Sequence, residues 1–128
     1  VPAAWNVTPN SIRDLTALPW VIGPPESACG QALKRLSEKY RFTPMHAHVC
    51  NEFPTMLSLV AAGLGTAILP SLALGGIDAE SVTITSIQTF CSRRLNAVHR
   101  IPRFGAEAIV TALLSLIDDV SKEIGFVH

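Results

Sequence analysis

The chain has 128 residues, of which 48% are hydrophobic and 16% are charged, and its ten basic and ten acidic residues give a formal net charge of +0. This length suits one domain with a sizeable core, and the apolar composition predicts extensive burial or a face that meets another protein. Because a basic excess is absent, the composition excludes strong binding to nucleic-acid phosphates by this chain alone.

Two further features concern the cellular compartment. No apolar run reaches the length of a membrane helix, and residues 1–4 do not resemble a signal peptide. Cys29, Cys50 and Cys91 are odd in number and widely spaced, which argues against a disulfide framework and favours a reducing compartment. We therefore expect a cytoplasmic protein without contact to a membrane.

In the first part of the chain, short apolar runs alternate with amphipathic segments. Ser11 and Ser27 each precede such a segment and suit the N-cap position of a helix. The expected elements are a helix over residues 11–17, a strand over 20–22, a helix over 27–40 and a strand over 46–50.

The next stretch, residues 51–70, is predicted to form a helix, a glycine turn and a short buried strand. Asn51 is expected to cap the helix, and Gly63 to end it in a left-handed conformation. Gly65 allows a tight turn, and the apolar run 66–69 predicts a strand covered on both faces. The expected apolar face of the helix consists of Met56, Leu57, Leu59, Val60 and Ala61.

The remaining segments complete an alternating pattern. The expected elements are a short helix or loop over residues 71–79, a half-exposed or edge strand over 82–87, an alternating strand over 93–99 and a long helix over 105–124, stopped by Gly125. Strands that alternate with helices predict an α/β fold with a largely parallel sheet and helices on both faces.

In open α/β sheets, ligands bind beyond the carboxyl ends of the strands. Two of the expected strand ends lead directly into helix N-termini, which favour an anion. A carboxylate or phosphate held by Ser27, by N–H groups near Ala28 and by Asn51 or Thr55 is the simplest interpretation. The alternative is that Ser27 and Asn51 only cap their helices. The charge of Glu52 opposes an anion if it points into the site.

Catalytic and metal signals are weak. The sequence has no nucleophile elbow, phosphate-binding loop or His-Glu-x-x-His motif. His46, His48 and Cys50 would share one face of a strand, but a fourth metal ligand is not apparent. We therefore favour structural or surface histidines over a metal site. Cys29 near a helix start is either a reactive thiol or, as we favour, a small core residue.

The order of these segments resembles the effector-binding region of LysR-type transcriptional regulators over residues 11–124. The most specific part is Leu-Val-Ala-Ala-Gly-Leu-Gly-Thr-Ala-Ile-Leu-Pro at residues 59–70. It is accompanied by Leu-Thr-Ala-Leu-Pro-Trp-Val-Ile-Gly-Pro-Pro at 15–25, the helix around 32–40, the Asn51–Glu52 turn, and Ser-Arg-Arg-Leu-Asn-Ala-Val-His-Arg at 92–100 before a long closing helix.

The resemblance implies a three-layer α/β sandwich with a mostly parallel sheet, built as a type 2 periplasmic-binding-protein-like lobe. In that family two lobes enclose a small effector, often an organic anion, and a winged helix-turn-helix domain binds DNA. Residues 11–91 correspond to the second lobe, 92–101 to the strand that crosses back, and 104–125 to the C-terminal helix of an incomplete first lobe. The DNA-binding domain and most of the first lobe lie outside this sequence.

The resemblance also implies where the effector binds: in the loop after the first strand of this lobe and at the later strand–helix turn. The candidate ligand-binding residues are Gly23, Pro24, Pro25, Glu26, Ser27, Asn51, Phe53 and Thr55. No catalytic residue, cofactor or metal is expected. Because the closing helix lacks its usual partner lobe, we expect self-association into a dimer or higher oligomer.

Two other functions remain open on the sequence alone. A lobe of a transport solute-binding protein has the same architecture, and an upstream signal peptide would favour it over an upstream helix-turn-helix. A small α/β enzyme would use Cys29 or the group of His46, His48 and Cys50. Selective labelling of the Cys29 thiol, or metal bound to the purified protein, would favour the enzyme. The sequence does not identify the effector, the promoter or the sign of regulation.

Overall fold

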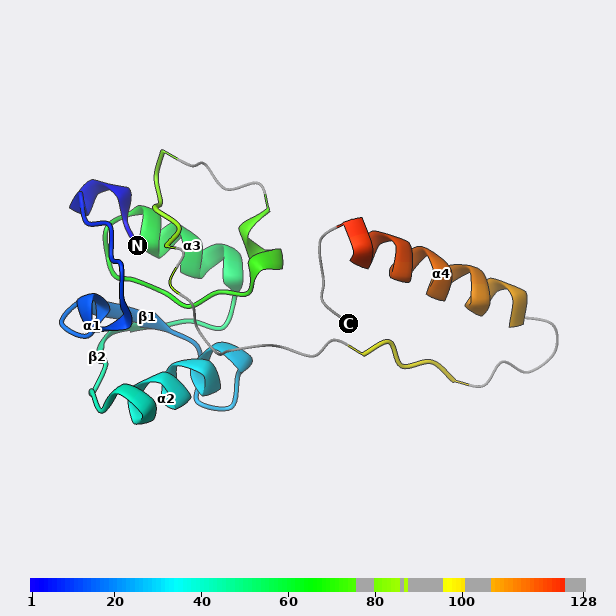
Figure 1. Cartoon of the computed structure of the whole chain (residues 1–128), viewed down its shortest axis with the longest axis horizontal. Helices are drawn as coiled ribbons and strands as arrows, with labels where there is room; N and C mark the ends of the chain where they lie inside the picture. Colours follow the sequence, from blue (N-terminus) through cyan, green and yellow to red (C-terminus); the bar gives the residue numbers. More distant parts are fainter. Residues whose placement is uncertain (76–79, 86, 88–95, 101–106, 124–128) are drawn as a thin grey trace. The chain divides into compact units, whose positions relative to one another are not determined.

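The computed structural model describes residues 1–75, 80–85, 87, 96–100 and 107–123. The chain divides into two compact units, Val1–Arg93 and Arg94–His128, which we treat separately. The first unit contains a two-stranded sheet and most of the helices, and the second contains one long helix (Figure 1).

The described elements alternate between helix and strand as an α/β chain does. In order they are η1 (Ala3–Trp5), α1 (Ile12–Leu15), β1 (Pro19–Ile22), α2 (Ala28–Tyr40), β2 (Met45–Val49), α3 (Phe53–Ala61), η2 (Ser71–Leu74) and α4 (Glu107–Glu123). The helices predicted before residue 62 are therefore present with slightly shifted ends.

β1 lies at the centre of the first unit because it has a neighbour on each side. On one side it pairs in parallel with β2, in a register that runs from Pro19 opposite Met45 to Ile22 opposite Val49. On the other side Thr66 forms an isolated parallel bridge with Trp20. The Thr66 N–H donates to the Pro19 carbonyl, and the N–H of the residue after Trp20 donates to the Thr66 carbonyl, both at 2.8 Å.

The core is split between the two faces of β1, since successive strand residues point to opposite faces. Trp20 and Val21 are each only 1% exposed. Trp20 packs with the buried residues Leu33 and Leu36 of α2 and with Ile12 and Leu15 of α1. Val21 packs with Met56 and Val60 of α3 and with Val82. Helices therefore cover both faces of the small sheet, as the alternating pattern predicts (Figure 1).

The helix ends follow local capping chemistry with one correction. Ser27 is the N-cap of α2, and Gly63 has a φ of +80°, as predicted. Asn51 is not the N-cap of α3, because the helix begins at Phe53 and the N-cap is Glu52. Pro54 is the second residue of the helix, where its missing N–H costs no bond within the helix.

The strand predicted over residues 66–69 is wrong as a regular element. Only Thr66 pairs with β1, and the described residues after it form no ladder. Pro70, which has no N–H, closes the segment, and residues 71–74 continue as the 3₁₀-helix η2. Residues 76–79, the end of the helix or loop predicted over 71–79, lie outside the described residues.

The two later strands are also not regular in the described parts. Val82 bridges Pro2 in antiparallel fashion, but residues 83–85 and 87 form no strand. Ile84 is 61% exposed although Val82 is buried, so the predicted alternation does not decide burial here. Of the strand predicted over 93–99, residues 93–95 lie outside the description, and residues 96–99 pair with no described segment.

The second unit is dominated by α4, which carries an apolar stripe along one side. No residue of α4 is buried. The stripe consists of Ile109, Leu113, Leu116, Ile117 and Val120, all about half exposed or more. The predicted stop at Gly125 falls outside the described residues.

Membrane insertion through a helix is not supported by the described part of the chain. None of its helices is both long enough and apolar enough to cross a bilayer.

Gly65 provides a test of the close approach between residue 66 and β1. A Cβ at this position would lie 3.0 Å from Val21 Cγ2, 3.1 Å from Val21 N and 3.2 Å from Pro19 O. Because two of these atoms are backbone atoms of a buried strand, we expect Gly65→Ala to lower the free energy of unfolding by about 1–3 kcal/mol.

Gly75→Ala is the matched control, because its Cβ would meet nothing nearer than Leu72 O at 3.9 Å and its φ is −66°. Urea denaturation of both variants measures the difference. Equal stability of the two variants would contradict the packing of residue 65 against β1.

Candidate functional site

The two loops predicted to bind ligand leave the sheet from the same edge. Ile22 and Val49 are register partners at the carboxyl ends of the parallel strands β1 and β2. The Cys50 N–H donates to the Ile22 carbonyl at 2.9 Å, so the pairing continues to the point where the chains diverge. The loop over residues 23–27 and the turn over 50–52 therefore begin as neighbours, as expected for a ligand-binding edge of an α/β sheet.

The first loop is closed by Ser27. Its hydroxyl donates to the Pro24 carbonyl at 2.7 Å and accepts from the Gly30 N–H at 3.0 Å. The Ser27 N–H also donates to the Pro24 carbonyl, at 2.9 Å. These bonds fold the loop back onto the first turn of α2. The structure thus gives Ser27 a capping role, which was one of the two interpretations of the sequence.

Two glycines make this fold-back possible. A Cβ on Gly30 would overlap the Pro24 carbonyl, and a Cβ on Gly23 would overlap the Ser27 hydroxyl. The loop therefore lies flat against α2. Its outer part is Pro25 and Glu26, which are exposed, and the Glu26 carbonyl accepts from Gln31 Nε2 at 3.2 Å.

The start of α3 is more open than the start of α2. Its N-cap residue, Glu52, makes no side-chain capping bond. Within the described residues, no hydrogen bond is made by the N–H groups of Phe53 and Thr55, and Pro54 has none to donate. Thr55 and Asn51 are exposed, so their polar groups face solvent beside this helix end. Such a group of donors at the positive end of a helix dipole suits an anion.

Phe53 lies at this edge and is also part of the core. It is half-buried and packs against the core cluster of Val21, Met56 and Val60. Glu52 is exposed and acidic, and its carboxylate complements the dipole of α3.

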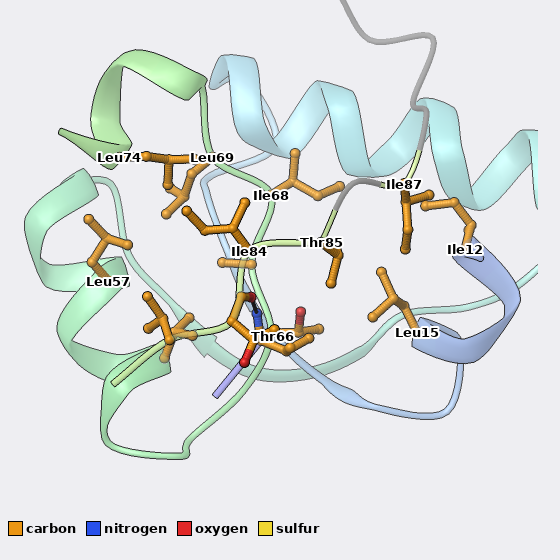
Figure 2. A pocket seen from close by; sticks show the side chains of 15 residues that line it. Ile12, Leu15, Leu57, Thr66, Ile68, Leu69, Leu74, Ile84, Thr85 and Ile87 are labelled. Carbon is orange, nitrogen blue, oxygen red and sulfur yellow. Dashed lines mark hydrogen bonds between the residues drawn. The ribbon is translucent and has the colours of Figure 1, made fainter. Parts of the chain in front are cut away.

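A hollow of about 180 Å³ lies at a different place in the first unit (Figure 2). Its walls come from residues 66–69, 82–85 and 87, and Ile12, Leu15, Leu57 and Val60 also line it. None of the predicted site residues lines this hollow. No sequence pattern predicts this hollow, although both apolar runs that form its walls are predicted as strands.

The candidate metal and thiol chemistry receives no support. Among the described residues there is no group of His, Cys, Asp or Glu that is able to hold a metal ion. His48 is exposed, and the Cys50 thiol donates to the Glu52 carbonyl at 3.6 Å. The side chain of His46 lies outside the description, as does Cys91. Cys29 is 6% exposed on the inner side of α2, as expected for a small core residue.

Comparison with known families agrees with the pattern of loops and helices. A family model described as LysR substrate binding domain matches residues 2–118. This match includes both loops at the carboxyl edge and most of α4. None of the curated proteins compared with the chain matches it.

Removal of the Ser27 hydroxyl tests its capping role. We expect Ser27→Ala to lower the free energy of unfolding by about 1 kcal/mol, because the Gly30 N–H loses its acceptor. Ser58→Ala is the control: the Ser58 hydroxyl donates to the Pro54 carbonyl inside α3, and alanine is the better helix former. Urea denaturation of both variants decides the point, and a larger loss for Ser58→Ala would refute the capping role.

Proposed function

Because the chain belongs to the family of LysR substrate-binding domains, we propose that it is the ligand-sensing part of a bacterial LysR-type transcriptional regulator whose effector is a small organic anion. The family is one of regulatory ligand-binding domains, so the chain acts by binding and not as an enzyme. The observation that carries this proposal is the family match over residues 2–118, and the shared edge of the two loops supports it.

The proposed architecture is a three-layer, type 2 periplasmic-binding-protein-like lobe. In this assignment residues 11–91 form the second lobe, 92–101 return to the first lobe, and 104–125 form its C-terminal helix. The helices on both faces of β1 support the first of these assignments. The same family match favours a regulator over a lobe of a transport protein.

The effector site in this proposal consists of Gly23, Pro24, Pro25, Glu26, Ser27, Asn51, Phe53 and Thr55. Within it the residues have different tasks. Ser27 shapes the first loop through its bonds to Pro24 and Gly30. The Thr55 hydroxyl and the N–H groups at the start of α3 are the donors for a carboxylate, since they have no hydrogen bond among the described residues.

Regulation in this proposal is a shift in population. An effector that binds better to a closed arrangement of two lobes shifts the protein toward that arrangement, by as much as the difference in affinity. The change then alters the geometry of the DNA-bound oligomer. DNA contact belongs to a helix-turn-helix domain outside these 128 residues, since this chain has a net charge of +0. The regulator acts in the cytoplasm.

Self-association is the second part of the proposal, and α4 supports it. Its stripe of Ile109, Leu113, Leu116, Ile117 and Val120 is exposed within its own unit. Full burial of an exposed side chain of this kind is worth about 1.5–3 kcal/mol, and these side chains, about half exposed, would gain part of it each. A stripe of this size therefore favours contact with another apolar surface.

Thr55→Ala tests the effector site. In a regulator that contains this domain, a panel of small carboxylates is screened by thermal shift, and the strongest binder is titrated by calorimetry. We expect Thr55→Ala to weaken its binding about 10- to 100-fold, because one hydrogen bond to a charged group is lost.

The control for Thr55→Ala is Thr43→Ala. Thr43 is also exposed, but it lies between α2 and β2, at the amino end of β2. Thr43→Ala is expected to leave effector affinity unchanged, and both variants should bind DNA normally. Unchanged effector affinity in Thr55→Ala would reject the assigned site.

Leu116→Glu tests self-association. The weight-average mass of the unaltered 128-residue chain, measured by sedimentation equilibrium, should exceed 13.7 kDa at high concentration. Leu116→Glu should lower it toward the monomer, because a charge in an apolar contact is costly. Ser115→Glu, on the other side of α4, should have little effect. A mass of 13.7 kDa for the unaltered chain at every concentration would contradict the proposal.

A further inference from the structure

The apolar stripe of α4 contains a heptad pattern. Ile109, Leu113, Leu116 and Val120 follow one another at intervals of four, three and four residues. This spacing places them along one seam of the helix, with Leu113 and Val120 at the positions called a in a coiled coil and the other two at the positions called d. All four side chains are about half exposed or more. The seam therefore suits a second helix with the same spacing.

The charge of α4 is concentrated at its carboxyl end. Glu107 is the only charged residue among the first eleven residues of the helix, whereas the last six contain Asp118, Asp119, Lys122 and Glu123. Lys122 pairs with Asp118 and, at 4.0 Å, with Asp119. Three acids and one lysine leave this end with a net charge of −2, and the negative end of the helix dipole adds to it. A second helix at the seam is therefore favoured if its own acidic end lies elsewhere.

Glu123 distinguishes the two possible orientations of such a pair. It follows Leu116 by seven residues and so occupies the next d position of the seam. In a parallel pair, a residue at d meets the same residue of the second helix. The two Glu123 carboxylates would then face each other, and the other acidic side chains would lie level with one another. Because like charges in contact are destabilising, the seam disfavours the parallel orientation.

The antiparallel orientation removes this conflict. Ile109 then meets Val120 of the second copy, and Leu113 meets Leu116, so every apolar residue of the seam has an apolar partner. In the same register Asp119, which borders the seam, lies beside Ala112 of the second copy. This places the acidic end of each helix next to the amino half of the other, where the helix dipole is positive.

We propose that α4 pairs in antiparallel orientation with α4 of a second copy of the chain, so that Leu113 of each copy packs against Leu116 of the other. This inference rests on the self-association proposed above and adds its surface and its orientation. The contact uses the same patch on both copies, so it closes at a dimer. An anionic lipid surface is a poor alternative, because α4 carries four acidic residues and one lysine.

The test places a charge next to Asp119 of the second copy. Ala112 and Asp119 are seven residues apart and occupy the same border of the seam. Within one helix they are separated by about 10.5 Å, a distance over which physiological salt screens exposed charges, whereas across the proposed pair they are neighbours. The variants are Ala112→Lys, Asp119→Lys and the combination of both. Thr111→Lys is the matched control, since it adds the same charge to the far side of α4.

Sedimentation equilibrium of the 128-residue chain gives the mass and the Kd of each form. We expect the unaltered chain to reach a dimer and no larger species. Ala112→Lys should lower Kd about 3- to 10-fold, because two Lys–Asp pairs form in each dimer. In the Asp119→Lys background the same change should raise Kd, since lysine then faces lysine. Thr111→Lys should leave Kd within about twofold of the unaltered value.

Two different outcomes would contradict the inference. All three altered residues are exposed, so the folded chain tolerates the changes. A chain that dimerises but shows additive effects of the changes at residues 112 and 119 would overturn the antiparallel pairing alone, and the stripe would then contact a parallel helix or another surface. A chain that stays monomeric at every concentration would overturn both the pairing and the self-association on which it rests.

Discussion

The two-sided pairing of β1 is the constraint on which the first unit depends. β2 pairs with one side of β1, and Thr66 bonds to the other side through its N–H and carbonyl. Helices cover both faces of this doubly paired strand, and Trp20 and Val21 form two separate cores, Trp20 with α1 and α2 and Val21 with α3. Loss of either pairing would expose one of these cores and release the loops that follow the strands.

The same pairing explains how the proposed ligand-binding edge arises without a dedicated motif. Parallel strands end at a common edge, so their following loops are brought together whatever their sequences. The chemistry is then divided between them. The first loop uses its serine to hold its own shape, whereas the second leaves a threonine and open N–H groups at a helix start. A capping residue and a residue proposed to bind ligand thus have the same sequence signature but different hydrogen bonds.

Local patterns predicted the parts of the fold that depend on local chemistry. The caps at Ser11 and Ser27 and the left-handed Gly63 follow from residue type and spacing. The strands at 66–69 and 82–87 were predicted less well, because strand regularity depends on a partner that no local pattern specifies. The hollow escaped prediction for the same reason, since its walls are distant in sequence. Capping signals also do not predict whether a loop binds an effector, because the same residue types cap helices and bind anions.

Amide hydrogen exchange of the first unit, followed residue by residue by NMR, tests the central pairing most directly. The amides of Val21, Thr66 and Cys50 each take part in a backbone hydrogen bond that joins β1 to a neighbouring segment. If β1 is held on both sides, these three amides exchange slowly and with similar opening free energies, because they open in one cooperative unit. Exchange at Thr66 and Val21 as fast as at the exposed residue Thr43 would contradict the account.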